Sequence, residues 1–175
     1  IASRFLIALA GLTRVLDVRT DPAVVNTINA GYALVDVDDT IIEVHGYAKQ
    51  GAGFGYSGVR GLNALLATLT TATSAPVIVA QRLRKGACGS PRGAKRLISD
   101  AVRTTRRLLG PKRLVLVRMD SAFYGRGAVH AATKGGAAVS VTVRMDKAVK
   151  KAIAAIDDSA WTTIEYTDAI YDEAT

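Results

Sequence analysis

Three acidic residues lie inside an apolar stretch that otherwise has the pattern of a β-strand. They are Asp36, Asp38 and Asp39, within the segment ALVDVDDTIIEVHG that runs from Ala33 to Gly46. Carboxylates placed in a strand lose hydration and repel one another unless a cation compensates them. Such a cluster is typical of a metal or phosphate site, so we expect the function to reside in this segment. The other interpretation is a strand that frays into an acidic surface turn, although no Gly, Pro or Asn interrupts it before Gly46.

A further carboxylate, Asp120, ends a second apolar run, LVLVRMD, 82 residues after Asp38. Substrates of open α/β sheets meet the carboxyl ends of the strands, which is where Asp120 is expected. If the two strands are neighbours, the carboxylates of Asp38 and Asp120 flank a gap that a metal ion fits, about 4–8 Å apart. Two metal ions so held can activate the attacking oxygen and stabilise the leaving oxygen in phosphoryl transfer.

The other potential metal ligands are few. The single cysteine, Cys88, excludes an internal disulfide and a multi-cysteine zinc site. The only histidines, His45 and His130, offer little for a histidine-based site. A metal bound here should therefore have oxygen ligands, which favours Mg²⁺ or Mn²⁺.

Size and charge favour one globular core with an anionic partner. The 175 residues are 49% hydrophobic and carry a formal charge of +8, which suits a polyanion approached with a divalent metal. No apolar run reaches the roughly 18 residues of a membrane span, and the opening residues lack a signal-peptide pattern, so we expect a cytoplasmic protein with no membrane partner. The first residue is Ile rather than Met, which suggests a piece of a longer reading frame.

The predicted elements form three segments. Residues 1–31 read as an N-terminal helical entry segment, with helices over 3–18 and 21–29. Residues 32–156 read as the core, and residues 157–175 as a tail or the start of an insertion. The strands of the core are expected at 33–39, 41–47, 62–71, 76–83, 114–119 and 138–145, and its helices at 91–109, 121–134 and 147–156. Three antiparallel strands followed by crossover units make an α/β mixed sheet with flanking helices, an order that resembles ribonuclease H-like domains.

The segments DVDDTIIEVHGYAKQGAGFGYSG, LRKGA and LVLVRMDSAFYG resemble the catalytic core of the DDE transposases of bacterial insertion sequences. In one group of that family, the first catalytic Asp lies in a D-x-T motif, which corresponds here to Asp38 and Thr40. The second opens a D-[SR]-x-[FY] segment, which corresponds to Asp120, Ser121 and Phe123. The resemblance covers residues 33–145.

This resemblance implies a ribonuclease H-like fold and metal-dependent DNA strand cleavage and strand transfer. Asp38 and Asp120 would be catalytic residues and metal ligands, with two Mg²⁺ or Mn²⁺ ions in the complete enzyme. The partners would be double-stranded DNA, as element ends and target, and a second copy in a homodimer of the full-length protein. The location would be the bacterial cytoplasm, in association with the nucleoid.

The sequence departs from the family at its third carboxylate, a Glu in a later helix. The only glutamates are Glu43, Glu165 and Glu173, and none occupies a corresponding place. We therefore expect a fragment that ends before its third ligand. It should fold, hold little metal and fail to cleave DNA, while keeping a weak, salt-sensitive affinity for DNA.

Two other functions are compatible with the same residues. Asp36 to Thr40 fits the D-x-D-x-T motif of haloacid dehalogenase-like phosphatases, with Asp36 as nucleophile and Asp38 as acid/base. The basic stretch Lys95–Arg107 would also suit a non-catalytic DNA-binding module. An antiparallel return of the chain directly after Thr40 would favour the transposase over the phosphatase.

Four basic residues are candidates for contacts with DNA phosphates: Arg82, Arg84, Lys85 and Arg118. A solvated strand end accounts for the first three equally well, and an ion pair with Asp120 accounts for Arg118. Because side chains alternate along a strand, Asp36 and Asp38 should share one face and Asp39 should lie on the other.

Overall fold

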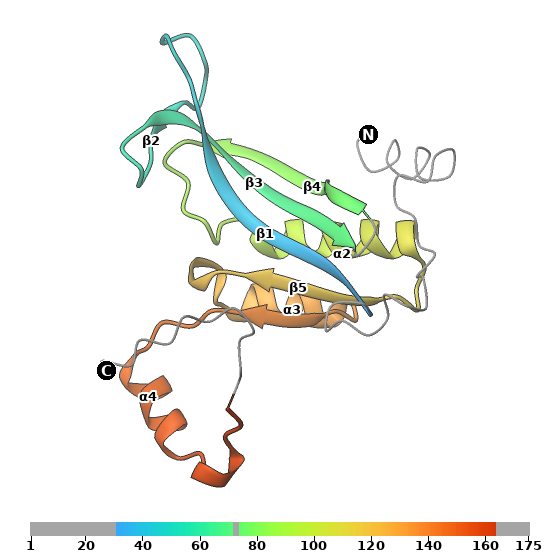
Figure 1. Ribbon diagram of the computed structural model, residues 1–175. Helices are drawn as coiled ribbons and strands as arrows, with labels where there is room; N and C mark the ends of the chain where they lie inside the picture. The colour runs from blue at the N-terminus through green and yellow to red at the C-terminus, as the bar shows by residue number, and fades with distance from the viewer. Residues whose placement is uncertain (1–30, 72–73, 164–175) are drawn as a thin grey trace, which may run out of the picture. The chain divides into compact units, whose positions relative to one another are not determined.

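The computed structural model describes residues 31–71 and 74–163, and the chain divides into two compact units, residues 1–142 and 143–175. The helices expected over 3–18 and 21–29 lie outside the described residues, as does the tail beyond residue 163. The six strands of the first unit form one sheet (Figure 1). They are β1 (Tyr32–Glu43), β2 (Gly53–Phe54), β3 (Arg60–Thr71), β4 (Ser74–Lys85), β5 (Leu114–Met119) and β6 (Ala138–Val141).

The sheet has the α/β mixed topology that the sequence predicts. Its order is β4–β3–β1–β5–β6, and β2 pairs with the first residues of β3. Strand β3 runs antiparallel to both β1 and β4, whereas β5 is parallel to β1 and β6 is parallel to β5. Three antiparallel strands followed by two parallel ones constitute a ribonuclease H-like sheet.

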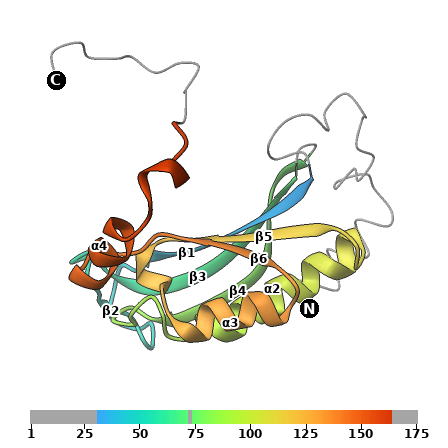
Figure 2. The same cartoon turned by 90° about the horizontal axis from the view of Figure 1, so that it is seen from below.

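Two helices cover one face of this sheet, α2 (Ala94–Leu109) and α3 (Arg126–Lys134) (Figure 2). Helix α2 buries Leu97, Ile98, Ala101 and Val102, which recur at helical spacing. The strands bury alternate residues against the helices, among them Val35 and Val37 of β1 and Leu65 and Leu69 of β3. The opposite face, which no described helix of this unit covers, is called here the open face.

The strand predictions around the acidic cluster were wrong in one respect. Residues 33–39 and 41–47 do not form two strands but one, β1, which continues to Glu43. The reason is its partner: β3 pairs with β1 without interruption from Leu34↔Thr70 to Glu43↔Gly61. The return after Thr40 is therefore antiparallel but not immediate, because a connection containing β2 lies between the two long strands.

The remaining elements differ from prediction mainly at their ends. The helix expected over 121–134 is divided into the 3₁₀ turn η3 (Ser121–Phe123) and α3, which begins after the extended residue Gly125. In the second unit, α4 (Lys147–Ala154) is followed by the 3₁₀ turn η4 (Asp158–Ala160), and neither contains a buried residue. Across the described ranges, no helix has the length and apolarity that a membrane crossing requires.

Candidate active site

The three aspartates of β1 divide between the two faces of the sheet, as strand alternation predicts. Asp39 lies on the side of the helices, where it meets Arg84 of β4. Asp36 lies on the open face, where it meets Arg118 of β5. Asp38, two residues beyond Asp36 on the same strand, shares its face.

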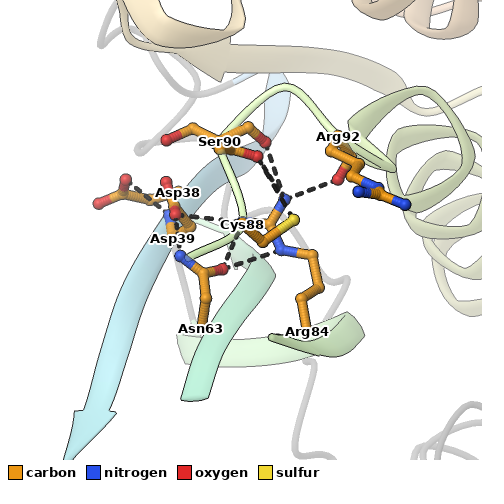
Figure 3. Close-up of polar contacts among 8 residues, drawn as sticks. Asp38, Asp39, Asn63, Arg84, Cys88, Ser90 and Arg92 are labelled. Carbon is orange, nitrogen blue, oxygen red and sulfur yellow. Dashed lines mark hydrogen bonds and ion pairs between the residues drawn. The ribbon is translucent and has the colours of Figure 1, made fainter. Parts of the chain in front are cut away.

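Asp39 belongs to a buried polar cluster (Figure 3). Its Oδ2 lies 3.1 Å from Nη2 of Arg84 and also accepts a hydrogen bond from Nδ2 of Asn63. The Arg84 Nε in turn donates to the Asn63 Oδ1 at 2.8 Å. The Arg84 and Asp39 side chains are only 9% and 14% exposed, and Asn63 is 3% exposed. The charge of Asp39 is thus neutralised within the protein.

The same arginine also holds the loop between β4 and α2. Its Nη1 donates to the backbone carbonyl oxygens of Gly89, Ser90 and Arg92, at 3.2, 3.0 and 2.6 Å. Every nitrogen of the guanidinium therefore has a protein partner. Arg84 thus ties β4, β1 and this loop together, so its guanidinium could contact a DNA phosphate only by giving up some of these bonds.

Asp36 is neutralised on the open face. Arg118 binds it with two hydrogen bonds, Nε to Oδ1 at 2.6 Å and Nη2 to Oδ2 at 2.9 Å. The hydrogen bonds that Arg118 donates to Asp36 raise the pKa of Arg118, against a smaller lowering by desolvation. The alternative ion pair of Arg118 with Asp120 is wrong, because the guanidinium is engaged by Asp36 instead.

The other two basic candidates differ in their environment. Arg82 forms an ion pair with Asp100 of α2, with an N–O distance of 2.9 Å. Lys85 is exposed and has no ion-pair partner among the described residues. Of the four candidates, Lys85 is therefore the one whose charge is available to a phosphate without breaking an internal pair.

Asp38 differs from both of its acidic neighbours. It is exposed, and its Oδ1 accepts a hydrogen bond only from the backbone N–H of Asp39, at 2.8 Å. Its side chain points away from Arg84 (Figure 3). No cation pairs with Asp38 in the described part of the chain.

Asp120 has a corresponding environment one strand away. It follows the last residue of β5, is exposed, and caps η3 by accepting the N–H of Ala122 on Oδ1 at 3.0 Å. Within the same described ranges it also lacks an ion-pair partner. In both carboxylates one oxygen is fixed by a backbone N–H, and Oδ2 has no hydrogen-bond donor among the described residues.

The register of β1 and β5 puts these two carboxylates next to each other. The parallel pairs are Asp36↔Arg118 and Val37↔Met119, so Asp38 and Asp120 occupy the following step. Asp120 keeps an extended backbone, with φ −80° and ψ 179°, which continues the direction of β5. Neighbouring strands lie about 4.8 Å apart and paired residues share a face. The expected separation of about 4–8 Å between the carboxylates stays a prediction that this register favours.

The Oδ2 atoms of Asp38 and Asp120, which accept no hydrogen bond from the described residues, are suitable ligands for a hard divalent cation. They form an incomplete set, because the described residues contain no group of three or more His, Cys, Asp and Glu side chains that could hold a metal. Glu43 lies five residues beyond Asp38 on β1, beside His45 at 4.0 Å, and Glu165 and Glu173 lie outside the described residues. A Mg²⁺ or Mn²⁺ ion bound by two carboxylates would keep several of its waters.

The sequence did not predict the Asp39–Asn63–Arg84 cluster. The sequence did contain an indication of it. Side chains alternate along a strand, so Asp39 lies on the opposite face from Asp36 and Asp38, where a buried carboxylate without a partner is costly. That requires a cation on a neighbouring strand. The pairing of Asn63 with Arg84 across β3 and β4 supplies it, but this register cannot be read from one sequence.

The solved structures similar to this chain include two transposase complexes. One is the Mos1 transposase paired-end complex with left transposon end, at 12% identity and a TM-score of 0.40, over 89% of this chain and 53% of that chain. The other is the Mos1 strand transfer complex, at 13% identity and a TM-score of 0.36, over 90% and 53% of the two chains. The present chain thus spans about half the length of these structures. No protein-family model and no curated protein matches the sequence.

Proposed function

We propose that this chain carries two of the three acidic ligands of a DNA strand-transfer site, as in the transposases of insertion sequences. One observation carries the proposal: among the three aspartates of β1, Asp38 is the one with no cationic partner among the described residues, and the β1–β5 register sets it beside Asp120. Two uncompensated carboxylates side by side repel each other, and a divalent cation bound between them would relieve that repulsion.

The protein's own groups would orient these ligands. The Asp39 N–H fixes Oδ1 of Asp38, and the Ala122 N–H fixes Oδ1 of Asp120, which leaves both Oδ2 atoms for Mg²⁺ or Mn²⁺. When bound, such ions activate the attacking oxygen and stabilise the leaving oxygen at phosphorus. Arg84 holds the backbone of β1 through Asp39, so it acts on Asp38 as a positioning residue. The third carboxylate would come from outside the described residues.

The phosphatase interpretation is less compatible with the geometry. It needs Asp36 as a free nucleophile, yet both oxygens of Asp36 accept hydrogen bonds from Arg118. In addition, the long strand that follows β1 is antiparallel to it, and this strand direction favours the transposase over the phosphatase although β2 intervenes.

The proposal extends to partners and setting. Double-stranded DNA, as element ends and target, is the partner that the formal charge of +8 and the exposed Lys85 suit. A bacterial insertion sequence, the D-x-T group of its transposases, a homodimer and a nucleoid location follow from the sequence resemblance.

The test is a DNA cleavage and joining assay with Mg²⁺ or Mn²⁺ on the protein in which these 175 residues occur. Asp38→Asn and Asp120→Asn should each lower the rate at least a hundredfold, because each removes a charged ligand. Asp36→Asn is the matched control on the same strand and face, and it should retain most of the rate. Phosphate ester hydrolysis that is lost in Asp36→Asn, with cleavage absent or unaffected by Asp38→Asn, would overturn the proposal in favour of the phosphatase.

A further inference from the structure

The segment that runs from the end of β1 through the first residue of β3, residues 44–60, exposes three aromatic side chains. Tyr47, Phe54 and Tyr56 are 93%, 67% and 107% exposed, respectively. Large aromatic side chains gain free energy when they are removed from water, so three exposed rings in one segment indicate a binding surface. The segment is called here the aromatic loop, and it extends beyond the end of β1 (Figure 1).

Two of these rings are grouped around one arginine. The guanidinium carbon of Arg60 lies 5.1 Å from the centroid of the Tyr47 ring, a cation–π contact. Phe54 pairs directly with Arg60 in the β2–β3 register, so its side chain is on the same side of the sheet. Tyr47, Arg60 and Phe54 therefore form one cluster of flat groups at the surface.

The backbone that carries the cluster is held in place. Arg60 donates from Nη1 to the carbonyl oxygens of Val44, at 3.2 Å, and Gly46, and its own carbonyl accepts the Val44 N–H at 3.1 Å. The Gly86 N–H donates to the Gly51 carbonyl at 3.0 Å. At Gly55 the packing leaves no room for a side chain, because a Cβ atom there would lie 2.6 Å from the Gly86 carbonyl oxygen. The rings are thus presented to solvent by a fixed scaffold, which lowers the entropy cost of binding.

The charge of the aromatic loop favours an anionic partner. Residues 44–60 contain Lys49, Arg60 and His45 but no Asp or Glu. Lys85, next to Gly86 at the base of the loop, is exposed and adds another positive charge. Aromatic rings interleaved with cations are the combination that binds nucleic acids by stacking on bases and attracting phosphates.

The register also places the cluster on the side of Asp38. Asp38 pairs with Leu66 and Ile42 with Leu62, and Arg60 lies two residues before Leu62, so all of them share the open face. Arg60 is six residues from Leu66 along β3, which corresponds to about 20 Å at about 3.3 Å per residue. At 3.4 Å per nucleotide, this length equals about six nucleotides of B-form DNA.

We propose that Tyr47 and Phe54 of the aromatic loop stack on unpaired DNA bases about six nucleotides from the phosphate that reacts at Asp38 and Asp120. This inference rests on the proposed function for the location of the reacting phosphate. The loop would hold the strand open beside the site, and Arg60 and Lys49 would face the phosphates of the same strand.

The experiment measures binding of the 175-residue chain to oligonucleotides that contain 2-aminopurine, whose fluorescence falls when it stacks on a ring. The probes are a duplex with a six-nucleotide unpaired region and a fully paired duplex of the same length. The unpaired probe should be quenched, and Tyr47→Ala with Phe54→Ala should abolish the quenching and weaken binding at least tenfold. Tyr47→Phe should bind normally, whereas Tyr47→Leu, apolar but not aromatic, should lose quenching. Trp161→Ala, at an exposed aromatic residue of the second unit, is the matched control and should change nothing.

The inference is overturned if the double variant binds and quenches like the wild type, or if it loses equal affinity for both probes. The proposed function then still stands if Asp38→Asn abolishes DNA cleavage. If the wild-type chain binds neither probe at low salt, both the inference and the DNA partner are wrong. Thermal melts by circular dichroism check that each variant is folded. If the double variant does not fold, the loss of quenching in the single variant Tyr47→Leu tests the inference instead.

Discussion

Substitution of Arg84 tests how β1 is held in position. In Arg84→Met, the aliphatic part of the side chain is roughly retained, whereas the ion pair to Asp39 and the hydrogen bonds to Asn63 and to three loop carbonyls are lost. Asp39, with its side chain 14% exposed, then keeps a negative charge that has no cationic partner, only the hydrogen bond from Asn63. We expect a large loss of stability.

The magnitude follows from burial. Removing one partner of a buried ion pair costs about 3–5 kcal/mol, because an uncompensated charge remains in a poorly hydrated place. For a chain of this length, that corresponds to a fall in the melting temperature of roughly 6–20 °C. Arg118→Met is the matched control, since it breaks the Asp36 pair whose side chains are 47% and 35% exposed. An exposed pair contributes about 0–1 kcal/mol.

The assay is urea unfolding of the wild type, both methionine variants, Asp39→Asn, and Asp39→Asn combined with Arg84→Met. The double variant should be more stable than Arg84→Met alone, because the unpaired charge is gone. The reasoning is refuted if Arg84→Met and Arg118→Met lose equal free energy of unfolding. It is also refuted if Asp39→Asn further destabilises the Arg84→Met protein.

Two other substitutions test local packing and a local pKa. Gly86→Ala should destabilise the first unit by about 1–3 kcal/mol, because its Cβ would overlap the backbone of Gly53 and Gly61. Gly89→Ala, where a Cβ meets nothing, should be nearly neutral in the same urea melts, and equal effects would contradict the packing. Hydrogen bonds from the Ser159 hydroxyl and, less strongly, from its backbone N–H lower the pKa of Asp157 from its ordinary value. The stabilisation of η4 should therefore be present above the pKa of Asp157 in the unfolded chain and be lost as pH falls through its lowered pKa in the folded chain. Ser159→Ala should raise the Asp157 midpoint in an NMR titration, and an unchanged midpoint would refute that cause.

The sequence predicted most of the sheet because its strands are bounded by strong signals. The run LVLVRM and the turn before it placed β5 within its actual bounds, and Gly110-Pro111 marked the end of α2. The end of β1 was harder to predict. Its last four residues, Thr40 to Glu43, are placed in the strand by pairing with β3 and not by their own pattern, so a break was expected where none exists.

In the site, too, the residues marked by their own stretch of sequence could be predicted, whereas the pairings made between distant strands could not. Asp38 and Asp120 are predictions from the sequence alone, because a carboxylate inside an apolar strand, or directly after one, is unusual. The partners of the other two acids depend on contacts made across strands, between Asp36 and Arg118 and between Asp39 and Arg84. Those pairings decide which carboxylate remains available, and they arise only when the sheet is assembled.

The central claim is that Asp38 and Asp120 share one divalent cation. Titration of the 175-residue chain with Mn²⁺, followed by water-proton relaxation and by paramagnetic broadening of backbone NMR signals, tests it directly. The account predicts one weak site that broadens the amides of residues 37–39 and 119–122. Its affinity should fall at least tenfold in both Asp38→Asn and Asp120→Asn and should be unchanged in Asp36→Asn. A site that survives either of the first two substitutions, or that is lost in Asp36→Asn, would contradict the shared ligand pair.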